Sequence, residues 1–105
     1  MKYVVRLTSR ADKDLRDIVE YIAFDLKAPE SAAGQLMRLE EAISKLDHMP
    51  ERFRRLESKT WKKCEVRVLP VDNYLVFYSP DVKDKVVTVI RVLYGGRNIE
   101  EELNG

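Results

Sequence analysis

Apolar residues recur at helical spacing in the first half of the chain, directly after a short strand-like segment at residues 2–7. Ser9 and Asp12 have the types and the spacing of a helix N-cap followed by a capping carboxylate. The pattern therefore predicts a first amphipathic helix from Arg10 to Asp25. The apolar positions that support it are Leu15, Ile18, Val19, Ile22 and Leu26.

A second helix is predicted after a short break. Pro29 disfavours helix at the residue before it and suits the first turn of a new helix. A new apolar stripe follows and should end near His48, before Pro50. Its positions are Ala32, Leu36, Leu39, Ile43 and Leu46. Two helices joined by so short a break are expected to pack as an antiparallel hairpin.

The second half of the chain is typical of strands. Residues 50–60 have no clear period and are expected to form a loop. Strands are then predicted at Lys62–Leu69, Tyr74–Tyr78 and Lys85–Leu93, with turns at Asp72-Asn73 and at Ser79-Pro80-Asp81. The last strand is the most apolar, so we place it in the middle of the sheet.

The resulting order of elements, β-α-α-β-β-β, predicts one α+β domain over residues 1–105. The helical hairpin should pack on one face of a mainly antiparallel, four-stranded sheet. The other face would then be open to solvent or closed by a partner.

Two arginines interrupt the apolar strands. Strand alternation places Arg91 on the same face as Val87 and Val89. A charge is rarely buried without a partner, so Arg91 either points to the less buried face or pairs with a carboxylate. Arg67 presents the same alternatives. Our hypothesis is that both arginines line a groove on the uncovered face of the sheet.

A glycine pair ends the last strand. Gly95 and Gly96 would allow a tight turn that presents Tyr94 and Arg97 at the end of the groove. Arg97 would then contact a target or pair with the acidic run that follows it. Tyr94 could stack on a base or act as a general acid, but half-buried packing is the favoured interpretation.

Composition limits the class of protein. The chain has 105 residues, 45% of them hydrophobic, which suits one domain with a real core. No segment approaches the roughly 20 apolar residues of a membrane helix, and the N-terminus has no signal-peptide pattern. With Cys64 as the only cysteine and a single histidine, neither an internal disulfide nor a zinc site is expected. We therefore expect a cytoplasmic protein with no metal and no cofactor.

The formal net charge of +1 conceals a basic segment. Residues 51–67 carry seven basic and three acidic side chains, a net charge of +4. Such a segment favours a phosphate backbone or an acidic protein as partner, although solvated loops often have this composition. Within it, Lys62 and Lys63 are expected to form the basic wall of the groove.

Four segments, in order, resemble the RelE/ParE superfamily of toxins from bacterial type II toxin–antitoxin systems. They are YVVRLTSRADKDLRDIVEYI, PESAAGQLMRLEEAISKLDHMPERF, VRVLPVDNYLVFYSP and VTVIRVLYGGRNIEEEL, and together they cover nearly the whole chain. The resemblance implies a small growth-inhibiting toxin held inactive by a cognate antitoxin, of the kind that stabilises plasmids. It also implies the β-α-α-β-β-β fold.

The superfamily divides by target. RelE-like members cut mRNA on the ribosome with cationic groups around the scissile phosphate, whereas ParE-like members inhibit DNA gyrase. In the RelE branch an arginine typically follows the tyrosine of the third strand, where this chain has Leu75, and a further tyrosine lies in the C-terminal segment, where this chain has none after Tyr94. Arg97 does match the arginine that follows the last strand.

The ParE branch fits these residues better, so gyrase inhibition is the favoured function. Two alternatives stay open: a ribosome-dependent mRNA endoribonuclease, which would be an enzyme, and a non-toxic relative that only binds antitoxin. The candidate target-contacting or catalytic residues are Arg97, Arg67, Arg91, Tyr94, Lys62 and Lys63, with Gly95 and Gly96 forming the turn.

Overall fold

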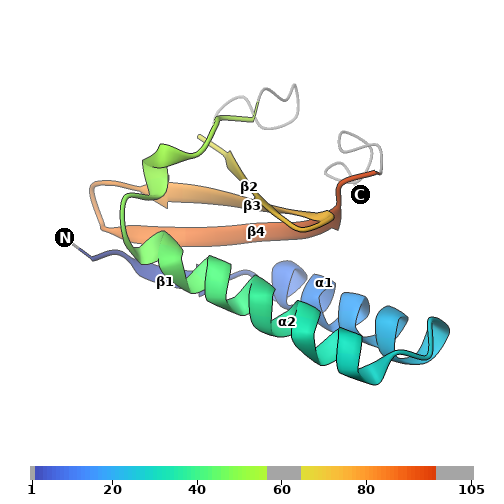
Figure 1. The fold of residues 1–105 in the computed structure, drawn as a ribbon. Coiled ribbons are helices and arrows are strands. Elements are labelled where there is room, and N and C mark those ends of the chain that lie inside the picture. The colour runs from blue at the N-terminus through green and yellow to red at the C-terminus, as the bar shows by residue number, and fades with distance from the viewer. Residues whose placement is uncertain (1, 57–64, 97–105) are drawn as a thin grey trace.

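The four strands form one mixed sheet in the order β1-β4-β3-β2 (Figure 1). The computed structural model describes residues 2–56 and 65–96. The strands are β1 (Val4–Leu7), β2 (Arg67–Val71), β3 (Tyr74–Asp81) and β4 (Val86–Tyr94). β1 pairs with β4 in parallel, and the other two pairings are antiparallel. The prediction that the last strand lies inside the sheet is confirmed.

The two predicted helices pack on one face of this sheet as an antiparallel hairpin (Figure 1). Helix α1 (Ser9–Glu20) continues into the π-helical turn η1 (Tyr21–Asp25), and α2 (Pro29–Ser44) continues into the short 3-10 helix η2 (Lys45–Asp47). The short helix η3 (Pro50–Arg52) follows. The predicted α+β architecture is confirmed. Within the described residues, no helix has both the length and the hydropathy to cross a membrane.

The first helix begins one residue earlier than the sequence pattern predicted. Thr8, not Ser9, is the N-cap, and its Oγ1 accepts a hydrogen bond from the backbone N–H of Ala11 at 3.1 Å. Both residue types serve as caps. Thr8 takes this position because its own N–H donates to the carbonyl of Val89 on β4, which fixes it at the end of the sheet.

The predicted turn at Ser79-Pro80-Asp81 is wrong, because β3 runs through these residues to Asp81. Pairing of β3 with β2 ends at Tyr78, whereas pairing with β4 continues to Asp81. A proline removes a backbone donor, and a strand with one free edge tolerates that loss. Pro80 therefore sits within a strand rather than in a turn.

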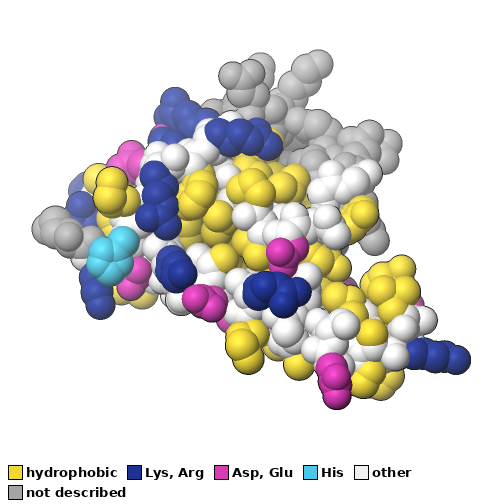
Figure 2. Space-filling model, in the orientation of Figure 1, with side chains coloured by type: hydrophobic (Ala, Val, Ile, Leu, Met, Phe, Trp, Pro, Cys, Tyr) yellow, Lys and Arg dark blue, Asp and Glu magenta, His cyan; other side chains and the backbone are white. Residues whose placement is uncertain are grey.

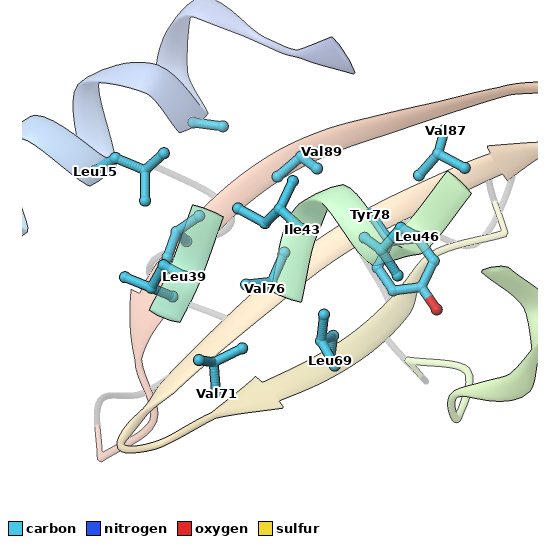
Figure 3. Packing of buried hydrophobic residues seen from close by; sticks show 12 residues of the cluster. Leu15, Leu39, Ile43, Leu46, Leu69, Val71, Val76, Tyr78, Val87 and Val89 are labelled. Atoms are coloured by element: carbon cyan, nitrogen blue, oxygen red, sulfur yellow. The ribbon is translucent and has the colours of Figure 1, made fainter. Parts of the chain in front are cut away.

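The main core lies between the helices and the sheet. Figure 3 shows aliphatic side chains of α1 and α2 meeting side chains of β2, β3 and β4. The fully buried members of the main core include Leu39, Leu46, Val76, Tyr78, Val87 and Val89. Side chains at alternate strand positions point to opposite faces, so Val76 and Tyr78 face the helices while Phe77 does not.

The opposite face of the sheet carries a second apolar cluster, not the expected basic groove. Its buried members are Val66, Val68, Phe77 and Leu93, and the partly buried Leu56, Leu75 and Ile90 pack against them. Because these side chains are apolar and mostly removed from solvent, this face stabilises the fold.

Tyr78 joins the core to the segment after α2. Its side chain is fully buried, and its hydroxyl donates a hydrogen bond to the carbonyl of Pro50 at 2.5 Å. Burial raises the pKa of Tyr78 from 10.0 to about 12. The folded state therefore favours the neutral phenol, whereas the unfolded chain ionises near its ordinary value.

We expect this difference in pKa to lower the free energy of unfolding at alkaline pH. Stability from Tyr78 should be complete below about pH 10 and decline as pH rises towards 12, since the folded state then binds more protons than the unfolded state. Tyr78→Phe should lower stability by about 1 kcal/mol at pH 8, through the lost hydrogen bond, and flatten the decline above pH 10. Urea unfolding at a series of pH values checks this. Tyr21→Phe, at a half-exposed site, is the control, and an equal flattening in it would contradict the assignment.

Candidate functional site

The end of β4 brings Tyr94 and the glycine pair together, as the sequence predicted. Tyr94 is about half exposed. Its ring packs edge-on against Tyr74 at the start of β3, with ring centroids 5.9 Å apart and planes at 76°. The backbone N–H of Gly95 donates to the carbonyl of Asn73 at 2.9 Å, which ties the end of β4 to the β2–β3 turn.

The glycines are needed for close approach, not for a left-handed turn. The predicted turn forms at Gly95 and Gly96, and neither residue has a positive φ angle. A Cβ atom on Gly96 would lie 2.6 Å from Cε2 of Tyr94, and one on Gly95 would lie 3.3 Å from the carbonyl oxygen of Asn73. The absent side chains therefore leave room for the tyrosine ring to lie over the turn.

A third tyrosine reaches this end of the molecule from the helices. Burial raises the pKa of Tyr74, and the nearby hydroxyls of Tyr21 and Tyr94 raise it further. Tyr21 begins η1, so η1, β3 and β4 each contribute one aromatic ring to a tyrosine cluster. Sequence reasoning did not connect Tyr21 with this site, because residues 21 and 94 become neighbours only in the folded chain.

Arg91 is a buried structural residue. It lies opposite Phe77 in the β3–β4 register, but its guanidinium is engaged by α1 and is not open to a groove. Its Nε donates to Oδ2 of Asp14 on α1 at 2.8 Å, and its Nη2 donates to Oδ1 at 3.2 Å. The guanidinium therefore binds both oxygens of the Asp14 carboxylate. Both side chains are less than a tenth exposed. The alternative in which Arg91 pairs with a carboxylate is therefore confirmed.

A β-bulge explains why simple strand alternation misplaced residues in β4. Pairing with β3 shifts register between Phe77 and Tyr78, so Ile90 has no partner on β3. After the bulge Val92 joins Val87 and Val89 in the main core, whereas alternation had put it on the other face. Thr8 fixes the bulge, since its Oγ1 donates to the carbonyl of Ile90 at 3.0 Å.

Asp14 is the residue that sequence reasoning missed. It was grouped with the solvent-facing carboxylates of the first helix, yet it is buried and also accepts a hydrogen bond from the N–H of Val92 at 3.0 Å. A signal was present, because Asp14 follows Ala11 by three residues and precedes Leu15, so it lies in the apolar stripe. A carboxylate in that stripe indicates a buried cation opposite.

Arg67 also has a structural role. Its Nη1 donates to the carbonyls of Glu51 and Phe53, and its Nη2 lies 3.3 Å from Oε1 of Glu65. It pairs with Tyr78 across the β2–β3 hairpin, so it shares the helix-side face of the sheet. The prediction that Arg67 lines an uncovered groove is therefore wrong.

The described part of the basic segment is partly neutralised. Glu65 binds Arg55 at 2.6 Å as well as Arg67. Burial alone would raise the pKa of Glu65, but hydrogen bonds from these two arginines hold it below its ordinary value. Figure 2 shows Lys and Arg side chains gathered on the side of the molecule where α2 ends and residues 50–56 follow. Arg52 and Arg54 are exposed there.

The candidate residues do not form a single groove among the described residues. Arg67 lies opposite Tyr78, whereas Tyr94 lies opposite Tyr74, at the other end of the β2–β3 pairing. The candidates Lys62, Lys63 and Arg97 fall outside the described residues, as does Cys64. What the described chain does present is an aromatic surface at the end of β4, where Tyr94 packs against Tyr74.

Several solved structures with this fold come from toxin–antitoxin systems. A chain of the chromosomal ParDE system from P. aeruginosa aligns with a TM-score of 0.69 at 19% identity, covering 89% of this chain and 96% of that one. The archaeal RelE–RelB complex from Pyrococcus horikoshii OT3 gives 0.63 at 23% identity, with coverage of 93% and 100%. A RelBE toxin–antitoxin complex from Mycobacterium tuberculosis gives 0.62 at 22% identity, with coverage of 90% and 92%. At these identities the similarity shows the fold.

The sequence itself identifies the family. No curated protein sequence matches the chain. The family model described as "ParE toxin of type II toxin-antitoxin system, parDE" matches residues 5–99, which is nearly the whole chain. The protein therefore belongs to the ParE toxin family of type II toxin–antitoxin systems.

Proposed function

We propose that this protein inhibits DNA gyrase by binding to it and is neutralised by a cognate antitoxin. The match to the ParE family over residues 5–99 is the observation that carries the proposal. Inhibition by binding requires a recognition surface but no catalytic groups. The exposed tyrosines at the end of β4 suit such a surface, because tyrosine and arginine are enriched among the residues that dominate binding energy.

The contacts of the strand arginines favour binding over RNA cleavage. Cleavage requires cations free to stabilise charge on a phosphate. Arg91 is engaged by Asp14, and Arg67 is engaged by Glu65 and by backbone carbonyls. The resemblance implies an arginine at position 75 in RelE-like members, whereas this chain has Leu75, which packs into the second apolar cluster.

An antitoxin partner is supported by the family and by the neighbouring structures, several of which are toxin–antitoxin complexes. The antitoxin is expected to be encoded beside the toxin gene. Coexpression should restore growth of cells that the toxin alone arrests.

The test of the target is direct. Purified protein should inhibit supercoiling of a relaxed plasmid by gyrase and leave cell-free translation intact. In cells, DNA synthesis should fail before protein synthesis after induction. Cleaved mRNA and early loss of protein synthesis would instead identify a ribosome-dependent nuclease. Normal growth with no effect on either process would identify a non-toxic family member.

Arg97→Ala is expected to weaken inhibition of the target. If Arg97 is a central contact, its loss should cost about 2 kcal/mol, so about thirtyfold more protein would be needed for half-inhibition of supercoiling. Urea unfolding should be unchanged. Arg16→Ala is the matched control, because Arg16 is an exposed α1 residue that pairs with the exposed Asp12 at 3.1 Å. Full potency of Arg97→Ala at equal stability would remove Arg97 from the proposed contact surface.

A further inference from the structure

The turn between β2 and β3 is tied to the helical layer through one carboxylate. Oδ2 of Asp72 accepts hydrogen bonds from Nε of Arg38 at 2.7 Å and from Nε2 of Gln35 at 3.1 Å. Both donors belong to α2. The hydrogen bonds from Arg38 and Gln35 lower the pKa of Asp72, so the carboxylate is ionised at neutral pH. We refer to these three side chains as the Asp72 cluster.

The same turn also holds the end of β4. Asn73 follows Asp72 directly, and its carbonyl accepts the hydrogen bond from the N–H of Gly95 at 2.9 Å. The next residue, Tyr74, lies opposite Tyr94 in the β3–β4 register and packs edge-on against its ring. Three consecutive residues therefore connect α2 with two rings of the tyrosine cluster. A displacement of the turn would move Tyr74 directly and the end of β4 through the hydrogen bond of Asn73.

Asp72 has an uncommon backbone conformation. Its φ angle is 55°, in the left-handed region, where residues other than glycine are rare although aspartate and asparagine are enriched. Such a conformation persists when the surrounding structure holds it. Gln35 is only 8% exposed, so one of the two donors to Asp72 is itself fixed by packing. The Asp72 cluster therefore stabilises the turn in a conformation that presents the Asn73 carbonyl to Gly95.

The Asp72 cluster is expected to matter little for global stability. The side chains of Arg38 and Asp72 are 57% and 43% exposed, and exposed ion pairs contribute little to the free energy of unfolding. Local opening of a turn requires much less free energy than unfolding of the whole domain. Loss of the cluster should therefore loosen the turn in a protein that stays folded.

We propose that Asp72, held by Gln35 and Arg38, is a positioning residue for target binding, because it fixes the turn that places the rings of Tyr74 and Tyr94. This inference rests on the proposed function, since it takes the tyrosine cluster as part of the surface that contacts gyrase. It gives α2 an indirect part in recognition, through a turn that is distant from it in sequence.

Arg38→Ala is the first test, because it removes the shorter hydrogen bond and leaves the turn residues unchanged. The binding-competent position of the rings would then be populated for part of the time only, which lowers apparent affinity. About fivefold more protein should be needed for half-inhibition of supercoiling, with an unchanged urea midpoint. Lys45→Ala is the matched control, because Lys45 forms an exposed pair with Glu41 at 3.3 Å and its loss removes the same charge. Its potency should equal that of the wild type.

Two changes at Asp72 separate the side chain from the backbone conformation. Glycine accepts the left-handed φ angle but has no acceptor for the α2 donors, whereas asparagine keeps both the conformation and an oxygen acceptor. Asp72→Gly should therefore reduce potency about fivefold or more, and Asp72→Asn by about twofold or less. Urea unfolding of each variant checks that it is folded.

The double variant distinguishes positioning from direct contact. If Arg38 acts through Asp72, adding Arg38→Ala to Asp72→Gly should produce no further loss of potency. If Arg38 touches gyrase itself, the two losses should multiply, and that result would contradict the proposal.

Hydrogen exchange provides a measurement that needs no gyrase. The amide of Gly95 should exchange faster in Arg38→Ala and Asp72→Gly than in the wild type or Lys45→Ala. The amide of Val4, bonded to the carbonyl of Lys85 at 2.9 Å near the start of β4, is the internal reference for opening of the whole sheet. Equal acceleration at both amides would indicate global destabilisation and overturn the positioning role.

The outcomes for the inference and for the proposed function can be told apart. Full potency of both single variants against gyrase that the wild type inhibits would overturn the inference and leave the proposed function intact. Failure of the wild-type protein to inhibit gyrase would overturn both, whatever the exchange of Gly95 shows.

Discussion

Replacing Asp14 with alanine is expected to destabilise the protein by about 3–5 kcal/mol, the usual cost of removing one partner of a buried ion pair. The change removes the carboxylate that neutralises the buried guanidinium of Arg91, and it also removes the acceptor for the N–H of Val92. A domain of this size has a total stability of about 5–15 kcal/mol, so the loss is a large share of the whole. Urea unfolding and thermal melting followed by circular dichroism measure it.

Asp17→Ala is the matched control for this prediction. Asp17 lies on the same helix and pairs with Lys13 at 2.9 Å, but both side chains are more than half exposed. Exposed pairs contribute little, so its loss should change stability by about 0.5 kcal/mol or less. A cost below about 1 kcal/mol for Asp14→Ala would show that the Arg91 pair is not a buried interaction of the usual strength.

A double variant separates the contribution of the ion pair to stability from the contribution of side-chain packing at the same positions. Asp14→Leu combined with Arg91→Met replaces both charges with apolar side chains and should be more stable than Asp14→Ala alone. The result bears on function, because single changes at Arg91 would impair folding and toxicity together. Arg91 is therefore a poor probe of target contact.

Phe77→Ala is expected to cost about 3–5 kcal/mol, as large-to-small changes at buried aromatic residues do. Phe77 is 1% exposed and belongs to the second apolar cluster, on the face of the sheet that the sequence left open. The change removes apolar contacts with the other members of that cluster and leaves a cavity. Urea unfolding at neutral pH measures the loss.

Phe24→Ala makes the same chemical change at an exposed site. Phe24 is 74% exposed on η1, so the substitution should change stability by about 0.5 kcal/mol or less. If Phe77→Ala proved equally mild, this face of the sheet would be an accessible groove and not a second core, and the earlier groove hypothesis would be restored for this face.

Periodicity was sufficient to predict the elements of this fold. The apolar stripes around Leu15 and Leu39 identified both helices, and the mainly apolar composition of β4 identified the inner strand. Local spacing carries this information, because the periods of helices and strands differ and a one-sided apolar surface must be buried. The order of elements then allowed few architectures besides two helices on one face of a sheet.

The ends of elements were less predictable because they depend on pairing partners distant in sequence. Thr8 caps α1 because its N–H donates to a carbonyl of β4. Pro80 can lie in β3 because the pairing of β3 with β2 ends at Tyr78. The bulge at Ile90 likewise depends on register against β3 and reverses the faces of the residues after it. A period-two argument cannot detect one extra residue in a strand.

The sequence by itself determined the α+β class, the helical hairpin, the inner position of β4 and membership of the ParE toxin family. Only the tertiary structure decided the roles of the strand arginines, because charge and position cannot reveal which carboxylate or carbonyl lies opposite. It placed Asp14 against Arg91 across 77 residues of sequence, and the carbonyl of Phe53 against Arg67 across 14. Those contacts form only when distant segments meet, and so Arg67 and Arg91, which the sequence offered as groove residues, serve instead to hold the fold together.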